Sequence, residues 1–198
     1  PYSLLAANGD SIGLADDTAA DCEVGHLTIG AGKRIKQDIT LCNEVLGSTL
    51  IEKNANLINF LTNLEEKEGT LHLMGMVSNG CIHSDITYMK NLITHLKNLG
   101  VKKLYFHAIT DGKDVPKDSA IQFLDELENV MKEVKLGKIA TICDRSFAMD
   151  RDNKWDKVKV YTDLIFKGSG VAIKNYAAGI QACYKKEVYD ENIPPILL

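Results

Sequence analysis

Five side chains able to bind anions or move protons follow three short apolar runs of the sequence. They are His83 after the first run, Lys113 and Asp114 after the second, and Arg145 and Arg151 after the third. A guanidinium group presents a planar fork of donors that matches two oxygens of a phosphate or carboxylate. A carboxylate among such cations can accept the proton of a bound hydroxyl group. Together these residues suit a small substrate that carries two negative charges.

Each of these residues also has a purely structural interpretation. Arginines form surface ion pairs more often than ligand contacts, and a lysine–aspartate pair is an ordinary turn composition. His83 is equally suited to capping a helix that begins near Ser84. Ser78, His83 and Asp85 lie too close together along the chain to indicate a catalytic triad. Only the convergence of three separate loops favours a binding site.

The sequence around these residues alternates between strand and helix patterns. Apolar runs predict strands over 71–77, 102–109 and 137–143. Apolar residues at steps of three and four predict helices over 54–67, 84–100, 118–135, 153–167 and 174–185. This order predicts an α/β fold in which a parallel sheet has helices on both faces. Because ligands bind beyond the carboxyl ends of parallel strands, we expect the five side chains to meet there.

The first 36 residues follow a different pattern. They are rich in Gly, Ala and Asp and contain no convincing long helix, so we expect loops and short strands there. This stretch is expected to belong to a unit other than the predicted α/β domain.

Composition excludes several classes of protein. The chain has 198 residues and a formal net charge of -4, which argues against general nucleic-acid binding. It contains no apolar run long enough for a membrane helix, and its opening residues lack the pattern of a signal peptide. Its five cysteines are odd in number and widely spaced, which disfavours a disulfide framework or a closed zinc site. We therefore expect a reduced, cytoplasmic domain without nucleic-acid or membrane partners.

Four segments resemble, in order and in register, the cofactor-independent (2,3-bisphosphoglycerate-independent) phosphoglycerate mutases. They are CEVGHLTIGAGKR (22–34), LHLMGMVSNGCIHSD (71–85), VKKLYFHAITDGKDV (101–115) and GKIATICDRSFAMDRDNKWDKV (137–158). The resemblance implies a glycolytic isomerase that interconverts 3-phosphoglycerate and 2-phosphoglycerate. It further implies two α/β domains. One belongs to the alkaline phosphatase superfamily and carries two divalent metal ions (Mn²⁺ or Mg²⁺) and a phosphorylated serine. The other is inserted in it and binds phosphoglycerate.

The same resemblance assigns roles to residues of this chain. His83, Asp114, Arg145 and Arg151 fall on substrate-binding positions, and Lys113 stands where the family usually has arginine. Asp114 is then the candidate acid/base for the glycerate hydroxyls, and His83 contacts the transferred phosphate. The implied division is a stub of the phosphatase-like domain over 1–36 and a phosphoglycerate-binding domain over 37–198. Members of the family are commonly monomeric.

Cys22 stands at the position of the family's serine, with Asp21 before it. The resemblance makes Cys22 the candidate nucleophile and metal ligand, although a soft thiolate is a poor substitute between hard Mn²⁺ ions. The family's other metal ligands have no counterpart here. We therefore expect a fragment or a natural short form that binds substrate, holds no metal and is inactive alone.

Two other functions compete with this interpretation. The first is a non-catalytic relative that binds a phosphometabolite or a partner protein, since such a protein would tolerate the loss of the serine. The second is a phosphatase that uses Cys22 as its nucleophile. This second function lacks the Cys-x5-Arg arrangement, because Thr28 stands at the arginine position.

Overall fold

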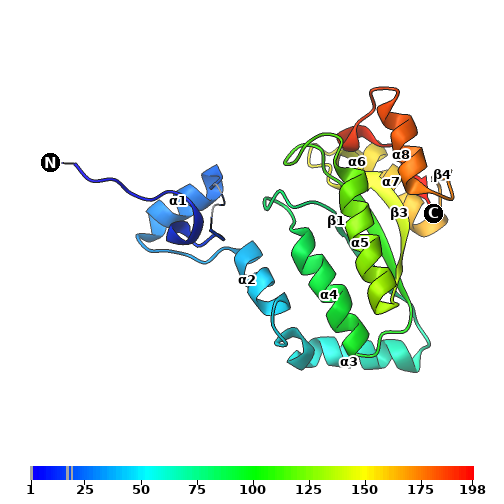
Figure 1. The fold of residues 1–198 in the computed structure, drawn as a ribbon, viewed down its shortest axis with the longest axis horizontal. Helices are drawn as coiled ribbons and strands as arrows, with labels where there is room; N and C mark the ends of the chain where they lie inside the picture. Colours follow the sequence, from blue (N-terminus) through cyan, green and yellow to red (C-terminus); the bar gives the residue numbers. More distant parts are fainter. Residues whose placement is uncertain (1, 17, 19) are drawn as a thin grey trace.

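The computed structural model describes residues 2–16, 18 and 20–198, and a five-stranded sheet lies at the centre of the larger part (Figure 1). The strands are β1 (Leu71–Met76), β2 (Leu104–Thr110), β3 (Lys138–Asp144), β4 (Val171–Ala172) and β5 (Ile196–Leu197). Their order is β1-β2-β3-β5-β4. Strands β1 to β3 are parallel, whereas β5 is antiparallel to β3. The α/β prediction is confirmed, but the sheet is mixed, because the short final strand β5 lies antiparallel to β3, between β3 and the edge strand β4.

Helices cover both faces of this sheet. Side chains of α4 (Ile86–Asn98), α5 (Ala120–Val134) and α8 (Tyr176–Tyr184) share one buried cluster with β2. On the opposite face, α6 (Arg145–Ala148) and α7 (Trp155–Lys167) pack on the other sides of the same strands. A further helix, α3 (Ala55–Glu66), runs across the end of α4 in Figure 1. The positions of α3, α4, α5, α7 and α8 agree with the helices predicted from apolar spacing, whereas the short helix α6 was not predicted.

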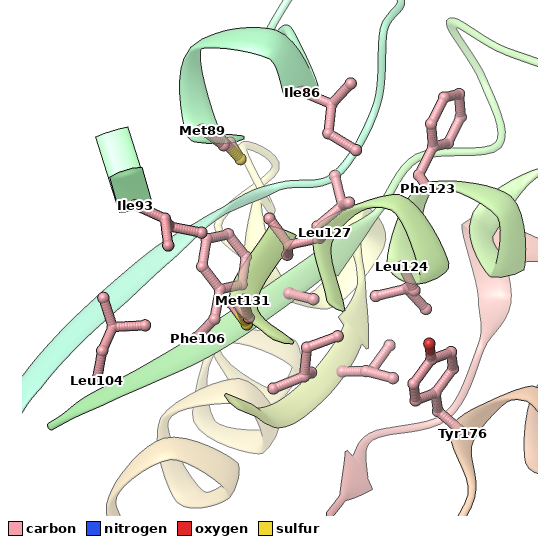
Figure 2. Packing of buried hydrophobic residues seen from close by; sticks show 14 of the residues in the cluster. Ile86, Met89, Ile93, Leu104, Phe106, Phe123, Leu124, Leu127, Met131 and Tyr176 are labelled. Carbon is pink, nitrogen blue, oxygen red and sulfur yellow. The ribbon is translucent and has the colours of Figure 1, made fainter. Parts of the chain in front are cut away.

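The main core lies between β2 and the helices α4 and α5. Figure 2 shows Phe106 of β2 with Ile93 of α4 and Leu127 of α5 close by, and all three are almost completely buried. Because side chains alternate along a strand, Ile109 of β2 points to the opposite face, where it packs with Leu164 of α7. Both faces of the central strands are therefore fixed by packing, which holds their carboxyl ends at one edge.

The N-terminal segment differs from the prediction of loops and short strands. It contains η1 (Gly9–Ile12) and a ten-residue helix, α1 (Cys22–Ala31), which lies apart from the sheet in Figure 1. Asp21 begins α1 by accepting a hydrogen bond from the Val24 amide, and Gly32 ends it with φ +60°. Two glycines within α1 reduce its helix propensity, which explains why the sequence pattern missed it.

A short connecting segment attaches to the sheet domain through α4. It comprises α2 (Asp38–Leu46) and η2 (Ile51–Lys53). The ring nitrogens of His95 on α4 lie 2.7 Å from a Glu52 carboxylate oxygen and 2.8 Å from the Leu46 carbonyl oxygen. One side chain therefore fastens both elements of the segment. Within the described chain, no helix is long and apolar enough to cross a membrane.

Asp190 fastens the C-terminal segment to the start of α5. One of its carboxylate oxygens accepts hydrogen bonds from the backbone amides of Ser119 and Ala120, each at 2.8 Å. The Thr110 hydroxyl at the end of β2 donates to the Asp190 carbonyl oxygen at 2.6 Å, and Tyr184 donates to the Asp190 carboxylate. Asp190 is only 1% exposed, so this contact is a buried cap that also holds residue 191 near the end of β2.

Asp190→Ala should lower the free energy of unfolding by about 2 kcal/mol, because two amides at a buried helix start lose their acceptor. Urea denaturation measures this change. Asp118→Ala, an exposed neighbour at the same helix start, is the matched control and should change stability by less than about 0.5 kcal/mol. Equal effects of the two substitutions would contradict the assigned cap.

Candidate functional site

Polar side chains gather where the three parallel strands end. Ser78 follows β1, Asp111 follows β2, and Arg145 follows β3 as the first residue of α6. Ser78 and Asp111 are buried at 1% and 2% exposure, and the Arg145 side chain is 13% exposed. The convergence expected from the sequence therefore occurs at this edge.

A hydrogen-bonded network of three charged side chains and one hydroxyl, which we call the Asp111 network, comprises Ser78, Asp111, Asp114 and Arg145. Nη1 of Arg145 donates to Oδ1 of Asp111 at 2.6 Å and to Oδ2 of Asp114 at 2.7 Å. The Ser78 hydroxyl donates to the other Asp111 oxygen at 2.6 Å. The backbone amides of Lys113 and Asp114 donate to Oδ1 of Asp111 at 3.2 and 3.1 Å. One buried carboxylate thus connects all three loops.

These contacts keep both members of the central ion pair charged. Burial alone would raise the pKa of Asp111, but hydrogen bonds from Ser78, the two backbone amides and Arg145 lower this pKa below its usual value. Burial acts to lower the pKa of Arg145, but Asp114 and Asp111 outweigh it and raise this pKa. The guanidinium is therefore held in place by two carboxylates rather than by packing alone.

Asp144 sets the direction in which α6 starts. Its Oδ1 accepts hydrogen bonds from the backbone amides of Ser146 and Phe147 at 2.6 and 3.1 Å. The residue is completely buried, and this burial raises the pKa of its carboxyl group although the two amides oppose the shift. The cap places Arg145, the next residue, directly at the end of β3.

Two glycines allow the loops to approach each other closely. A side chain at Gly80 would come within 2.9 Å of Cβ of Asp114. Gly112 has φ +71°, and a side chain there would come within 2.7 Å of Cβ of Asp190. The loops after β1 and β2 and the C-terminal segment therefore meet around Asp114.

A cavity of about 260 Å³ opens beside the Asp111 network. Its lining residues are His83, Lys113, Arg145, Ser146, Met149, Asp150, Arg151, Asp152, Lys157 and Glu191. Four of the five residues predicted from the sequence are in this lining. The fifth, Asp114, bonds to Arg145, and its Oδ2 lies 3.9 Å from Nε2 of His83. The structure thus brings all five together.

The cations of this cavity differ in how they are paired. Arg145 has two carboxylate partners, which agrees with its structural interpretation as an ion-pair residue. Lys113, Arg151 and Lys157 take part in none of the ion pairs formed by the described residues. Both hydrogen bonds from Arg145 to Asp111 and Asp114 come from Nη1, so Nε and Nη2 have no hydrogen-bond partner among the described residues. The cavity can therefore bind anions through three cations and one guanidinium edge.

Sequence reasoning missed several residues of this site. Asp111 is read as part of an Asp-Gly turn, although its place directly after a strand was a usable signal. Lys157 lies in the predicted helix over 153–167 and in the segment 137–158 that resembles the family, but nothing in the sequence marked it as a ligand residue, and Glu191 lies beyond the last predicted helix. Conversely, the capping role considered for His83 belongs to Asp85, which accepts a hydrogen bond from the Thr87 amide.

Cys22 lies elsewhere, as the exposed first residue of α1. Among residues 2–16, 18 and 20–198, no group of three or more His, Cys, Asp or Glu side chains is placed to hold a metal ion. The described residues therefore do not fit a two-metal centre, and no chemical step can be derived through one.

Comparison with known proteins identifies the family. The family described as "BPG-independent PGAM N-terminus (iPGM_N)" matches residues 43–198. The chain belongs to this family. The resemblance to the 2,3-bisphosphoglycerate-independent phosphoglycerate mutases is thereby confirmed, and it extends beyond the matched residues to the full chain in curated relatives.

Two relatives and one solved structure show how far the similarity reaches. Enzymes named 2,3-bisphosphoglycerate-independent phosphoglycerate mutase from Clostridium acetobutylicum and Prochlorococcus marinus are 37% and 36% identical to this chain over its whole length. The chain covers 39% and 37% of these proteins. A phosphoglycerate mutase from Leishmania mexicana, solved at low cobalt concentration, superimposes with a TM-score of 0.87 at 31% identity. That match covers 96% of this chain and 36% of the other. The chain thus spans about two-fifths of the length of its relatives.

Asp111→Asn tests the network through its pH dependence. Because the pKa of Asp111 is lower in the folded protein, its stabilisation is complete above about pH 4 and is lost as pH falls through the folded value. The variant should be less stable than wild type by about 3 kcal/mol at pH 7, and this gap should narrow below about pH 4. Urea unfolding at a series of pH values measures the gap. A gap that stays constant down to pH 2 would contradict the assignment.

Proposed function

We propose that this chain is the phosphoglycerate-binding part of a mutase that interconverts 3-phosphoglycerate and 2-phosphoglycerate in glycolysis. One observation carries the proposal. The cavity at the strand ends collects Lys113, Arg151 and Lys157 without carboxylate partners, beside the outward edge of Arg145. A small phosphate ester with a carboxylate group offers anionic oxygens to these cations and is small enough for a cavity of about 260 Å³.

We further propose how the chain is divided. Residues 37–198 form the phosphoglycerate-binding domain, and residues 1–36 belong to the catalytic domain of the alkaline phosphatase superfamily. The match of the family to residues 43–198 supports this division. So does the small separate cluster of Ile12, Leu14 and Val24 around α1.

Each side chain of the site has a role in this proposal. Lys113, Arg145 and Arg151 bind the anionic groups of the glycerate, and His83 contacts the phosphate. Asp114 accepts the proton of a glycerate hydroxyl, since its carboxylate lies between Arg145 and His83. Lysine at position 113 provides a point charge rather than the bidentate donors of an arginine, so it binds an anionic group of the substrate less tightly.

Turnover requires groups that the described residues do not assemble. The complete mutase is proposed to use two Mn²⁺ or Mg²⁺ ions, and Cys22 stands at the position of its nucleophile and metal ligand. Because the described residues place no cluster of metal ligands around Cys22, this chain should bind phosphoglycerate without converting it. We place the protein in the cytoplasm as a monomer without nucleic-acid or membrane partners.

The residues at positions 21 and 22 favour a second function. A non-catalytic relative that binds a phosphometabolite or a partner protein would tolerate Cys22 and the extra negative charge of Asp21. The length of the polypeptide that the gene encodes separates the two functions. A longer product with the remaining metal ligands supports the mutase, whereas a product without them supports the non-catalytic relative.

The purified chain should bind 3-phosphoglycerate weakly in calorimetry and show no mutase activity in an enolase-coupled assay with added Mn²⁺. Binding is expected because Lys113, Arg151 and Lys157 line the cavity, and inactivity because the described residues assemble no metal centre. A full-length relative is the positive control for the assay. Absence of binding would refute the proposed function, and measurable turnover would refute the proposed lack of a catalytic centre.

Arg151→Glu should weaken 3-phosphoglycerate binding at least tenfold, because an unpaired cation of the cavity becomes a repelling carboxylate. Calorimetry measures the affinity. Lys167→Glu makes the same change of charge on α7 outside the lining residues, and it should leave the affinity unchanged. If Arg151→Glu binds 3-phosphoglycerate as tightly as wild type, Arg151 is a surface charge and does not contact the ligand.

A further inference from the structure

Lys157 is a cation of the cavity that comes from α7, an element without any expected chemical role. It lies in the first turn of this helix and is partly buried, whereas its neighbours Lys154 and Lys159 are exposed. It reaches the same cavity as Lys113 and Arg151. Its position depends on the packing of α7 against the sheet through Tyr161 and Leu164.

The other lysines of this region have carboxylate partners. Lys154 pairs with Asp152 at 3.3 Å, and both Lys159 and Lys167 pair with Asp163. Lys157 forms no ion pair with the described residues, although its charge acts to lower the pKa of the buried Asp144 carboxyl group. Its Nζ instead lies 5.6 Å from the centre of the Phe147 ring on α6. A cation over an aromatic face is held by a modest attraction that leaves its N–H donors available.

The balance of charge in the cavity makes this ammonium group important. The lining contains four basic residues (Lys113, Arg145, Arg151 and Lys157) and three acidic ones (Asp150, Asp152 and Glu191). The surplus is therefore a single positive charge. Removing Lys157 would leave the lining neutral. When Asp111 and Asp114, the carboxylate partners of Arg145, are counted as well, four cations face five carboxylates with Lys157 present and three face five without it.

We propose that Lys157 is a further substrate-binding residue that holds the phosphate group of the ligand together with Arg151. The inference rests on the proposed function. An ammonium group offers three donors and a compact charge, which suit the tetrahedral oxygens of a phosphate dianion. The planar edge of Arg145 suits the flat carboxylate at the other end of the glycerate.

Substitutions at two positions of α7 test this inference, with binding followed by NMR titration. Lys157→Met should weaken both 3-phosphoglycerate and inorganic phosphate roughly tenfold, and Lys157→Arg should bind within about threefold of wild type. Lys159→Met removes the same charge from a lysine that already has a carboxylate partner, and it should change neither affinity. Thermal unfolding of each variant shows whether the fold is retained.

The outcomes separate this inference from the proposed function. If wild type binds 3-phosphoglycerate and Lys157→Met binds it equally well, the role of Lys157 is refuted and the proposed function stands. If wild type binds inorganic phosphate but not 3-phosphoglycerate, the proposed function fails, while a loss of phosphate affinity in Lys157→Met alone still supports the phosphate contact. Equal losses in Lys157→Met and Lys159→Met would refute a specific contact.

Discussion

The ion pairs of two carboxylates with one guanidinium group organise the edge of the sheet where the parallel strands end. Asp111 and Asp114 both accept from Nη1 of Arg145, and Ser78 fixes Asp111 from the loop after β1. Residues of this network follow all three parallel strands: Ser78 follows β1, Asp111 and Asp114 follow β2, and Arg145 follows β3. The network therefore forms only when the three strands end together. An ion pair of this kind contributes geometry more than stability, because much of its attraction is offset by the cost of burying its charges. That geometry leaves Nε and Nη2 of Arg145 without hydrogen-bond partners among the described residues, beside the cavity that Arg145 lines.

Much of the site could be predicted because it follows from the topology. Once 71–77, 102–109 and 137–143 are recognised as strands, residues after each of them must share an edge. Asp111 was missed because its partners, Ser78 and Arg145, are 33 and 34 residues away, and an Asp-Gly pair looks like a turn when read alone. Lys157 was missed because only the folded structure shows which lysine of α7 has no ion-pair partner among the described residues.

The fold could be predicted from the sequence where the periodic patterns are long. The prediction failed where these patterns are short. The helices α4, α5 and α7 carry clear apolar stripes. The two-residue strand β5 carries none, and its antiparallel pairing with β3 depends entirely on tertiary contacts. Helix α1 was hidden by Gly25 and by its exposed apolar residues. Ile29 of this helix is 82% exposed, which is unusual for a helix that packs within a finished domain.

The central claim is that a preformed, fixed Arg145 edge and a group of unpaired cations bind a three-carbon phosphate ester. A crystal structure of the chain with 3-phosphoglycerate tests it most directly. The account predicts the ester in the cavity beside Arg145 and Arg151, with the bonds from Nη1 to Asp111 and Asp114 intact. A ligand bound instead in the larger cavity between α3 and the end of α4, or an Arg145 that has left Asp111, would contradict it.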